Sequence, residues 1–228
     1  MAGERDLTIA VDGPVGAGKS TAARLLAARL GYRHIDTGAM YRALALKALR
    51  EGVAWEDGAR LRALLQQMEI GFVPGSAGQR LVVGEEDWTD AVRQPEVDRG
   101  ASLVSVHPAV REVMVARQRA LGAGGGIVMD GRDIGTVVFP AADVKFYLDA
   151  SAEERVRRRS AEAVTQGKPR PPEAVRAEVL SRDRRDMERT AGPLRAAPDA
   201  IRLDTTAMTP EAVAEVMLGV VRRRQHAR

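Results

Sequence analysis

The residues with the clearest chemistry form a glycine-rich loop near the start of the chain. Residues 13–20 read Gly-Pro-Val-Gly-Ala-Gly-Lys-Ser and satisfy the pattern G-x-x-x-x-G-K-[ST]. Glycines let successive backbone N–H groups point at one anion, and a following helix adds the partial positive charge of its N-terminus. In such a loop Lys19 reaches the β- and γ-phosphates of a nucleotide, and Ser20 ligates Mg²⁺. A plain glycine-rich turn is the alternative, but only about 0.003 matches are expected by chance in this composition.

Three other segments carry charged side chains that suit a reaction between two phosphates. Residues 34–42 read His-Ile-Asp-Thr-Gly-Ala-Met-Tyr-Arg, residues 130–136 read Asp-Gly-Arg-Asp-Ile-Gly-Thr, and residues 182–189 are rich in arginine and acid. A phosphate acceptor is largely dianionic at pH 7, so it needs no general base. It needs several fixed cations and the exclusion of water instead. Arginines on separate chain segments meet that requirement.

Asp130 follows the short apolar run Ile127–Met129, which predicts that it ends a strand. From that position its carboxylate would face the hydration shell of Mg²⁺. The alternative is a turn aspartate that caps Gly131.

The stretch from Arg155 to Pro172 has the composition of a lid. Its arginines lie near both ends of a connection that contains glycine and prolines, as a clamp that closes over ATP requires. We expect Arg158 and Arg159 to contact ATP. The alternative is a solvated helix whose arginines pair with nearby glutamates at i,i+4 spacing.

The elements that must position these residues alternate between strands and helices. Strands are predicted at 7–11, 32–35, 127–129, 144–148 and 201–203. Helices are predicted up to residue 30, at 39–51, 56–68, 93–104, 109–121, 152–166 and 173–190, and from residue 210 onward. This alternation predicts a mainly parallel sheet covered on both faces, with a small antiparallel hairpin inserted between residues 70 and 89 around a Pro-Gly-Ser-Ala-Gly turn.

Length and composition exclude several classes of protein. The 228 residues suit one domain with an inserted lobe. Cysteine is absent, which excludes disulfides, thiolate zinc sites and cysteine nucleophiles. No run of eighteen uninterrupted apolar residues occurs, so we expect no membrane span. The polar residues before the first strand lack a signal-peptide pattern, which favours the cytoplasm.

The charge balance argues against a nucleic-acid partner. Lysine and arginine total 35 and the acids 31, for a net charge of only +4, and aromatic residues make up 4%. Stacking platforms for bases are therefore scarce. Lysine accounts for four of the cations, so arginine dominates, and a base-composition bias would explain most of it. An arginine-rich, nucleotide-dependent RNA-binding protein is the alternative of a different class.

The chain resembles the bacterial cytidylate kinases, a branch of the nucleoside monophosphate kinases. The resemblance rests on the segments Asp36–Arg42 and Asp130–Pro140 and runs from about Leu7 to the last helix. It implies an α/β fold of the P-loop NTPase type, with a parallel sheet flanked by helices, a small antiparallel β insert and a lid. It also implies transfer of the γ-phosphoryl group from ATP to CMP or dCMP, with Mg²⁺.

The resemblance assigns residues to two binding sites. The ATP phosphates would lie against Gly13, Pro14, Val15, Gly16, Ala17, Gly18, Lys19, Ser20 and Thr21. The acceptor would be held by Thr37, Arg42, Ser102, Arg111, Arg132, Asp133, Arg182, Asp186 and Arg189. The catalytic set would comprise Lys19, Asp130, Arg132, Arg182 and Arg189.

The resemblance also divides the acceptor among these residues. Arg42 and Arg132 would lie near its phosphate, and Asp133 and Arg182 would hold its pentose. The positions associated with the cytosine ring and the closed site are Ser102, Arg111 and Arg189, with Asp186 as a supporting acid.

We therefore expect a single kinase unit over residues 1–228. Its core would comprise 1–37, 105–157 and 173–228, its CMP-binding lobe 38–104 and its lid 158–172. We expect a cytoplasmic monomer that transfers the phosphoryl group directly between small nucleotides and binds neither nucleic acid nor a membrane. A P-loop kinase for another small acceptor, such as UMP, is the nearest alternative.

Overall fold

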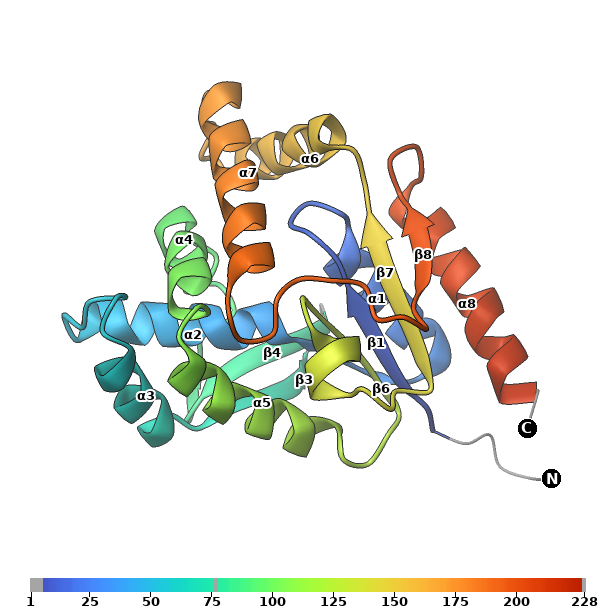
Figure 1. Ribbon diagram of the computed structural model, residues 1–228, viewed down its shortest axis with the longest axis horizontal. Coiled ribbons are helices and arrows are strands. Elements are labelled where there is room, and N and C mark those ends of the chain that lie inside the picture. Colours follow the sequence, from blue (N-terminus) through green and yellow to red (C-terminus); the bar gives the residue numbers. More distant parts are fainter. Residues whose placement is uncertain (1–5, 76–77, 227–228) are drawn as a thin grey trace.

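The computed structural model describes residues 6–75 and 78–226 (Figure 1). Its elements are β1 (Thr8–Asp12), α1 (Lys19–Leu30), β2 (Arg33–Asp36), α2 (Thr37–Arg50), α3 (Gly58–Gln67), β3 (Ile70–Gly75), β4 (Gly78–Val83), β5 (Glu86–Asp87), α4 (Pro95–Val104), α5 (Pro108–Gly122), β6 (Ile127–Gly131), a π-helix (Ile134–Val138), β7 (Val144–Asp149), α6 (Ala152–Thr165), α7 (Pro172–Glu188), β8 (Ile201–Asp204) and α8 (Pro210–His226). Three short stretches lie outside the described residues: the N-terminal residues 1–5, the tip of the predicted hairpin turn at 76–77, and residues 227–228.

A five-stranded parallel sheet forms the centre of the molecule, which confirms the predicted fold class. Its strand order is β2-β6-β1-β7-β8, with β1 in the middle. Parallel pairing sets Asp12 of β1 beside Gly131 of β6 and Tyr147 of β7, so the carboxyl ends of these strands meet at one edge. In open α/β sheets, ligands bind in the crevice outside this edge.

Helices cover both faces of the sheet. Side chains along a buried strand alternate between the two faces, so each face must be packed against other elements. Ile9 and Val11 of β1 pack in a cluster with Leu26 of α1 and Met217 of α8. Ala10 between them belongs to a separate cluster on the π-helix side of the sheet.

The segment from α2 to α5 forms a lobe with its own hydrophobic core. Leu44 of α2, Leu65 of α3, Leu81 of β4 and Met114 of α5 belong to this cluster. Its small sheet has the order β3-β4-β5 and is antiparallel, so the predicted hairpin is confirmed and gains a third strand. The two residues of β5 are both charged and carry no strand pattern that the sequence could reveal.

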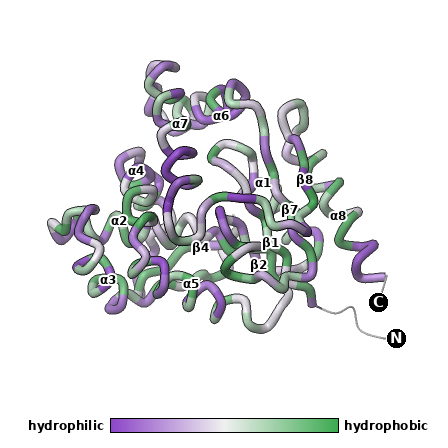
Figure 2. Tube along the Cα trace, in the orientation of Figure 1, coloured by the Kyte–Doolittle hydropathy of each residue, from purple (hydrophilic) through white to green (hydrophobic). Residues whose placement is uncertain are grey.

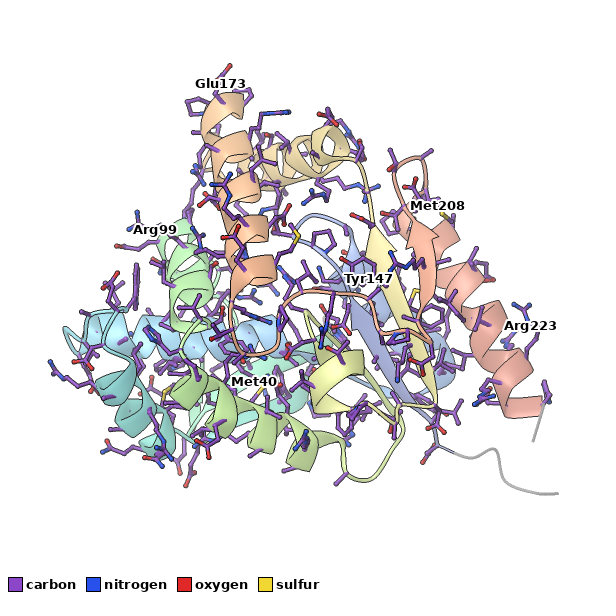
Figure 3. The ribbon with its side chains drawn as sticks, viewed as in Figure 1. Met40, Arg99, Tyr147, Glu173, Met208 and Arg223 are labelled. Carbon is purple, nitrogen blue, oxygen red and sulfur yellow. The ribbon has the colours of Figure 1, made fainter. Side chains whose placement is uncertain are left out.

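Helices α6 and α7 stand over the carboxyl edge of the main sheet (Figure 1). Val175 and Val179 of α7 pack against Val15 in the glycine-rich loop, which seats α7 beside that loop. Glu173 marks the outer end of α7 (Figure 3), while its inner half is strongly hydrophilic (Figure 2). Within residues 6–75 and 78–226, no helix is long and apolar enough to cross a membrane.

Candidate active site

The glycine-rich loop connects β1 to α1 in a conformation that only glycine permits. Gly13 has a φ of +147°, and a Cβ on it would lie 1.9 Å from the carbonyl oxygen of Leu148. Gly18 caps α1 in the left-handed region, with a φ of 82° and no side-chain cap. The first N–H groups of α1 are therefore left without an intrahelical partner and can bind an anion.

Lys19 opens α1 and lies almost fully buried beneath the loop. Its Nζ donates a hydrogen bond of 2.7 Å to the carbonyl oxygen of Pro14. Burial lowers the pKa of Lys19 well below its usual value, and the neighbouring Arg132 guanidinium adds to the effect. An anion at this position would relieve that electrostatic penalty.

Asp130 is the second-to-last residue of β6 and lies next to the loop, one residue before the end of the strand. One carboxylate oxygen accepts a hydrogen bond of 2.6 Å from the hydroxyl of Ser20, and the other lies 2.7 Å from Nε2 of His34. The backbone carbonyl of Asp130 accepts a hydrogen bond of 2.7 Å from Thr37. This carboxylate thus joins the loop to β2 and to the start of α2.

His34 belongs to this cluster although the sequence did not single it out. It lies on β2, directly beside β6 in the parallel sheet, opposite Val128. Burial by itself would lower the pKa of His34, but the Asp130 carboxylate outweighs burial and raises it.

A cavity of about 590 Å³ runs from the loop to the lobe. It brings together most of the predicted site residues: Val15, Gly16, Gly18, Lys19, Ser20, Thr21, Thr37, Arg42, Arg111, Asp130, Arg132, Asp133, Arg159, Arg182, Asp186 and Arg189. Five predicted residues do not line it, namely Gly13, Pro14, Ala17, Ser102 and Arg158. The hydroxyl of Ser102 instead accepts a hydrogen bond of 3.1 Å from Arg185, while Ala101 and Ser105 line the cavity beside it.

Two buried aspartates organise the arginines at the far end of the cavity. Asp133 is paired with Arg111 and, at 3.2 Å, with Arg189. Asp186 accepts a hydrogen bond of 2.8 Å from Arg132 and lies 3.9 Å from Arg189. Burial raises the pKa of Asp133 despite its two cations. Burial alone would also raise the pKa of Asp186, but the surrounding arginines outweigh it and lower that pKa.

Two further aspartates complete this network, and neither was assigned a role from the sequence, although Asp36 opens a segment that was singled out there. Asp36 accepts a hydrogen bond of 2.6 Å from Arg42. Asp98 of α4 lies 2.6 Å from Arg159 and 2.9 Å from Arg182. Burial favours neutral Asp98, but its arginines outweigh burial and hold the pKa of this carboxyl far below its usual range.

The two predicted lid arginines have different surroundings on α6. Arg159 reaches across the cavity to Asp98. Arg158 turns instead toward β8 and donates a hydrogen bond of 2.6 Å to the carbonyl oxygen of Thr205. The guanidinium of Arg158 still lies beside the glycine-rich loop, because its Nη1 would be 3.6 Å from a Cβ placed on Gly18.

A buried ion pair joins α6 and α7 to the glycine-rich loop. Arg155 pairs with Asp183 at 2.5 Å and donates a hydrogen bond of 3.2 Å to the carbonyl oxygen of Val15. Both side chains are less than a tenth exposed. The helix that carries Arg182 and Asp186, and that ends just before Arg189, is thereby tied to the loop.

The donor set suits Mg²⁺ held together with a nucleotide. Among the residues that the structure describes, no group of three or more His, Cys, Asp or Glu side chains could hold a metal alone. Mg²⁺ usually takes one or two protein oxygens and completes its shell with waters and substrate phosphates. The Ser20 hydroxyl and the Asp130 carboxylate, 2.6 Å apart at the end of the loop, fit that pattern.

The chain is similar to known proteins over nearly its whole length. A family model described as "Cytidylate kinase" matches residues 9–223. A "Cytidylate kinase" of Geobacillus thermodenitrificans is 52% identical over 221 residues, which cover 97% of this chain and 99% of the relative. A "Cytidylate kinase" of Geobacillus kaustophilus is 51% identical with the same coverage.

One solved structure is similar in fold alone. It is an uncharacterized protein from Eubacterium ventriosum with a TM-score of 0.50 and 7% identity, and the match covers 95% of this chain and 98% of that chain.

Proposed function

The chain belongs to the cytidylate kinase family, and on this premise we propose that it transfers the γ-phosphoryl group of ATP to CMP or dCMP. The products are ADP and CDP or dCDP. One observation carries the proposal: a single cavity joins a phosphate-binding loop to a network of arginines and carboxylates on separate elements. That combination suits a reaction in which two phosphorylated molecules must meet.

The loop side receives ATP. The N–H groups at the start of α1 bind its phosphates, and Lys19 exchanges its bond to the Pro14 carbonyl for phosphate oxygens. Arg159 lines the same cavity from α6, and Arg158 lies beside Gly18. We assign both to the lid that closes over ATP.

Ser20 and Asp130 are the residues that would hold Mg²⁺. The ion, when bound with ATP, neutralises charge on the β- and γ-phosphates. Asp130 also orients the Ser20 hydroxyl, because their hydrogen bond fixes which way its oxygen points.

The lobe side receives the acceptor. Arg42 and Arg132 line the cavity and present guanidinium groups to its phosphate, for which planar bidentate donors are well suited. Asp133 and Arg182 are assigned to the pentose, and Arg111 and Arg189 to the cytosine end. Ser102 supports the base side indirectly, through its bond from Arg185. Thr37 and Asp186 position the backbone and the arginines around the acceptor.

Transfer is direct and in line, without a phosphoenzyme. The acceptor phosphate is already largely ionised at pH 7, so no residue has to remove a proton from it. The contribution of the protein is to align two anions, offset their repulsion with fixed cations and exclude water. A monomeric state and a cytoplasmic location accompany this proposal as predictions.

A panel of acceptors tests the function. CMP, dCMP, UMP, AMP and GMP are each supplied with ATP and Mg²⁺, and ADP release is measured. CMP and dCMP should give the highest kcat/KM values. A clear preference for UMP or another monophosphate would contradict the proposal. ATP hydrolysis that ignores every acceptor would also contradict it.

A further inference from the structure

Asp98 is the point where three arginines from three helices converge. It lies in the first turn of α4 and lines the cavity, and its side chain is 14% exposed. Arg159 of α6 lies 2.6 Å away, Arg182 of α7 2.9 Å and Arg42 of α2 3.8 Å. The neighbouring Arg99 points outward from the molecule (Figure 3), so the two residues serve different sides of α4.

The three arginines depend on Asp98 to different extents. Arg42 is also held by Asp36 at 2.6 Å, and Arg159 by Glu162 at 2.7 Å. Within residues 6–75 and 78–226, Asp98 is the only ion-pair partner within 4 Å of Arg182. The Nε of Arg182 is buried and has no hydrogen-bond partner among the described residues. A buried donor without a partner indicates that this guanidinium is prepared for a further acceptor.

The chemistry around Asp98 matches that of a phosphate site. Guanidinium groups bind a carboxylate and a phosphate with the same planar pairs of N–H donors. Arg42 and Arg182 are assigned to the acceptor nucleotide under the proposed function, and Arg159 to the lid. The acceptor therefore needs two donors that Asp98 already holds, Arg42 for its phosphate and Arg182 for its pentose. It also meets the like charge of the Asp98 carboxylate.

We propose that Asp98 is a positioning residue that stands in for the acceptor while the site is empty. It keeps Arg42, Arg159 and Arg182 gathered from three helices, and the acceptor then takes over Arg42 with its phosphate and Arg182 with its pentose. The inference rests on the proposed function, because that function supplies the phosphate. Its consequence is that Asp98 opposes binding of the acceptor while it preserves the shape of the acceptor site.

Binding measurements on the full chain test this role. Isothermal titration gives the Kd for CMP and for inorganic phosphate in the wild type and in D98N, D98E and E96Q. Asp98→Asn removes the competing charge, so both ligands should bind roughly three- to tenfold more tightly. Asp98→Glu keeps the charge and should return the affinity toward that of the wild type. Glu96→Gln removes an exposed acid from the same helix turn and should change Kd less than twofold.

The steady-state kinetics separate this role from a merely structural one. Asp98→Asn should lower KM for CMP, whereas a structural defect would lower kcat and leave KM unchanged or higher. Asp98→Ser serves as the second substitution if D98N does not fold, as judged by its thermal unfolding. Equal or weaker CMP binding in a folded Asp98 variant overturns the inference. Failure of the wild type to use CMP overturns the proposed function instead, so the two failures are distinguishable.

Discussion

The two ends of the cavity present their positive groups in different ways. At the loop end, backbone N–H groups, one lysine and the N-terminus of α1 face the site, and they come from one stretch of eight residues. At the lobe end, arginines from α2, α5 and α7 are each paired with an aspartate. The loop end is local and built from the backbone. The lobe end is assembled from distant segments and built from side chains.

The pKa values of the carboxyl groups show the same contrast. Asp12 lies at the base of the loop and accepts hydrogen bonds from the N–H groups of Ile134 and Gly135, at 2.8 and 2.7 Å. Burial raises its pKa to about 6, because backbone donors offset burial only in part. At the other end, arginines outweigh burial and lower the pKa of Asp98 and Asp186, while burial outweighs the arginines at Asp133 and raises its pKa. A local site can therefore rely on peptide dipoles, whereas an assembled site needs paired charges to hold its arginines in place.

The largest expected effect comes from breaking the loop end. Lys19→Ala removes the cation that the proposed function places nearest the transferring phosphoryl group, so kcat should fall roughly a thousandfold or more. The fold should persist, because burial already disfavours the charged form of Lys19 in the empty enzyme. Steady-state kinetics measure the fall in kcat, and thermal unfolding shows whether the fold persists. Lys47→Ala, on a half-exposed lysine of α2, is the control that should keep its activity. Full activity in K19A would refute the assignment of the loop.

Removing an arginine from the lobe end should affect one substrate selectively. Arg132→Ala removes a guanidinium assigned to the acceptor phosphate, so kcat/KM for CMP should fall on the order of a hundredfold. KM for ATP should change less than about threefold, since the backbone N–H groups of the loop end do not depend on Arg132. Arg60→Ala, on the exposed face of α3, is the matched control. Equal losses for both substrates would show that the two ends are not separable.

The connection between the two ends can be tested through stability. Asp183→Asn leaves Arg155 buried without its charge partner, and such a loss costs about 3 to 5 kcal/mol. Glu153→Gln breaks the exposed pair between Glu153 and Arg176, which joins the same two helices, and should change stability little. Urea unfolding of both variants measures the difference. Equal stability of D183N and E153Q would mean that the buried pair is not what ties α7 to the loop.

A smaller, pH-dependent effect is expected from Asp12. Its folded pKa of about 6 lies above the ordinary value of 3.8, so the folded state binds more protons between these values. Stability contributed by protonated Asp12 is therefore lost as pH rises from about 4 to about 6, at most about 3 kcal/mol.

Comparison with Asp12→Asn isolates this contribution, because asparagine does not titrate. Urea unfolding at pH 4, 5, 6 and 7 should show the wild type losing stability relative to D12N as pH rises. A difference that stays constant or grows in favour of the wild type would contradict the raised pKa.

The sequence predicted the loop end well because its information is contiguous. The pattern of residues 13–20, the apolar strand before it and the helix after it are all readable along the chain, and the parallel sheet follows from the alternation of elements. Asp130 was also predicted at the end of its strand, since a carboxylate that closes an apolar run is visible locally.

The lobe end was predicted only in part because its pairings depend on which elements meet in space. The arginines were identified, but Asp36 and Asp98 were not, since nothing in their local sequence shows which arginines approach them. His34 was missed because its partner Asp130 lies on a neighbouring strand 96 residues away. The π-helix at Ile134–Val138 was missed as well. It is held by the buried carboxylate of Asp12, which no local pattern indicates.

The product balance of a single reaction shows whether the two ends of the cavity act on two nucleotides together. ³¹P NMR of the enzyme with ATP, CMP and Mg²⁺ follows every phosphate at once. We expect one CDP for each ADP formed, with no inorganic phosphate beyond the enzyme-free control. Formation of ADP and inorganic phosphate without CDP would contradict this expectation, because the two ends of the cavity would then not act on two nucleotides together.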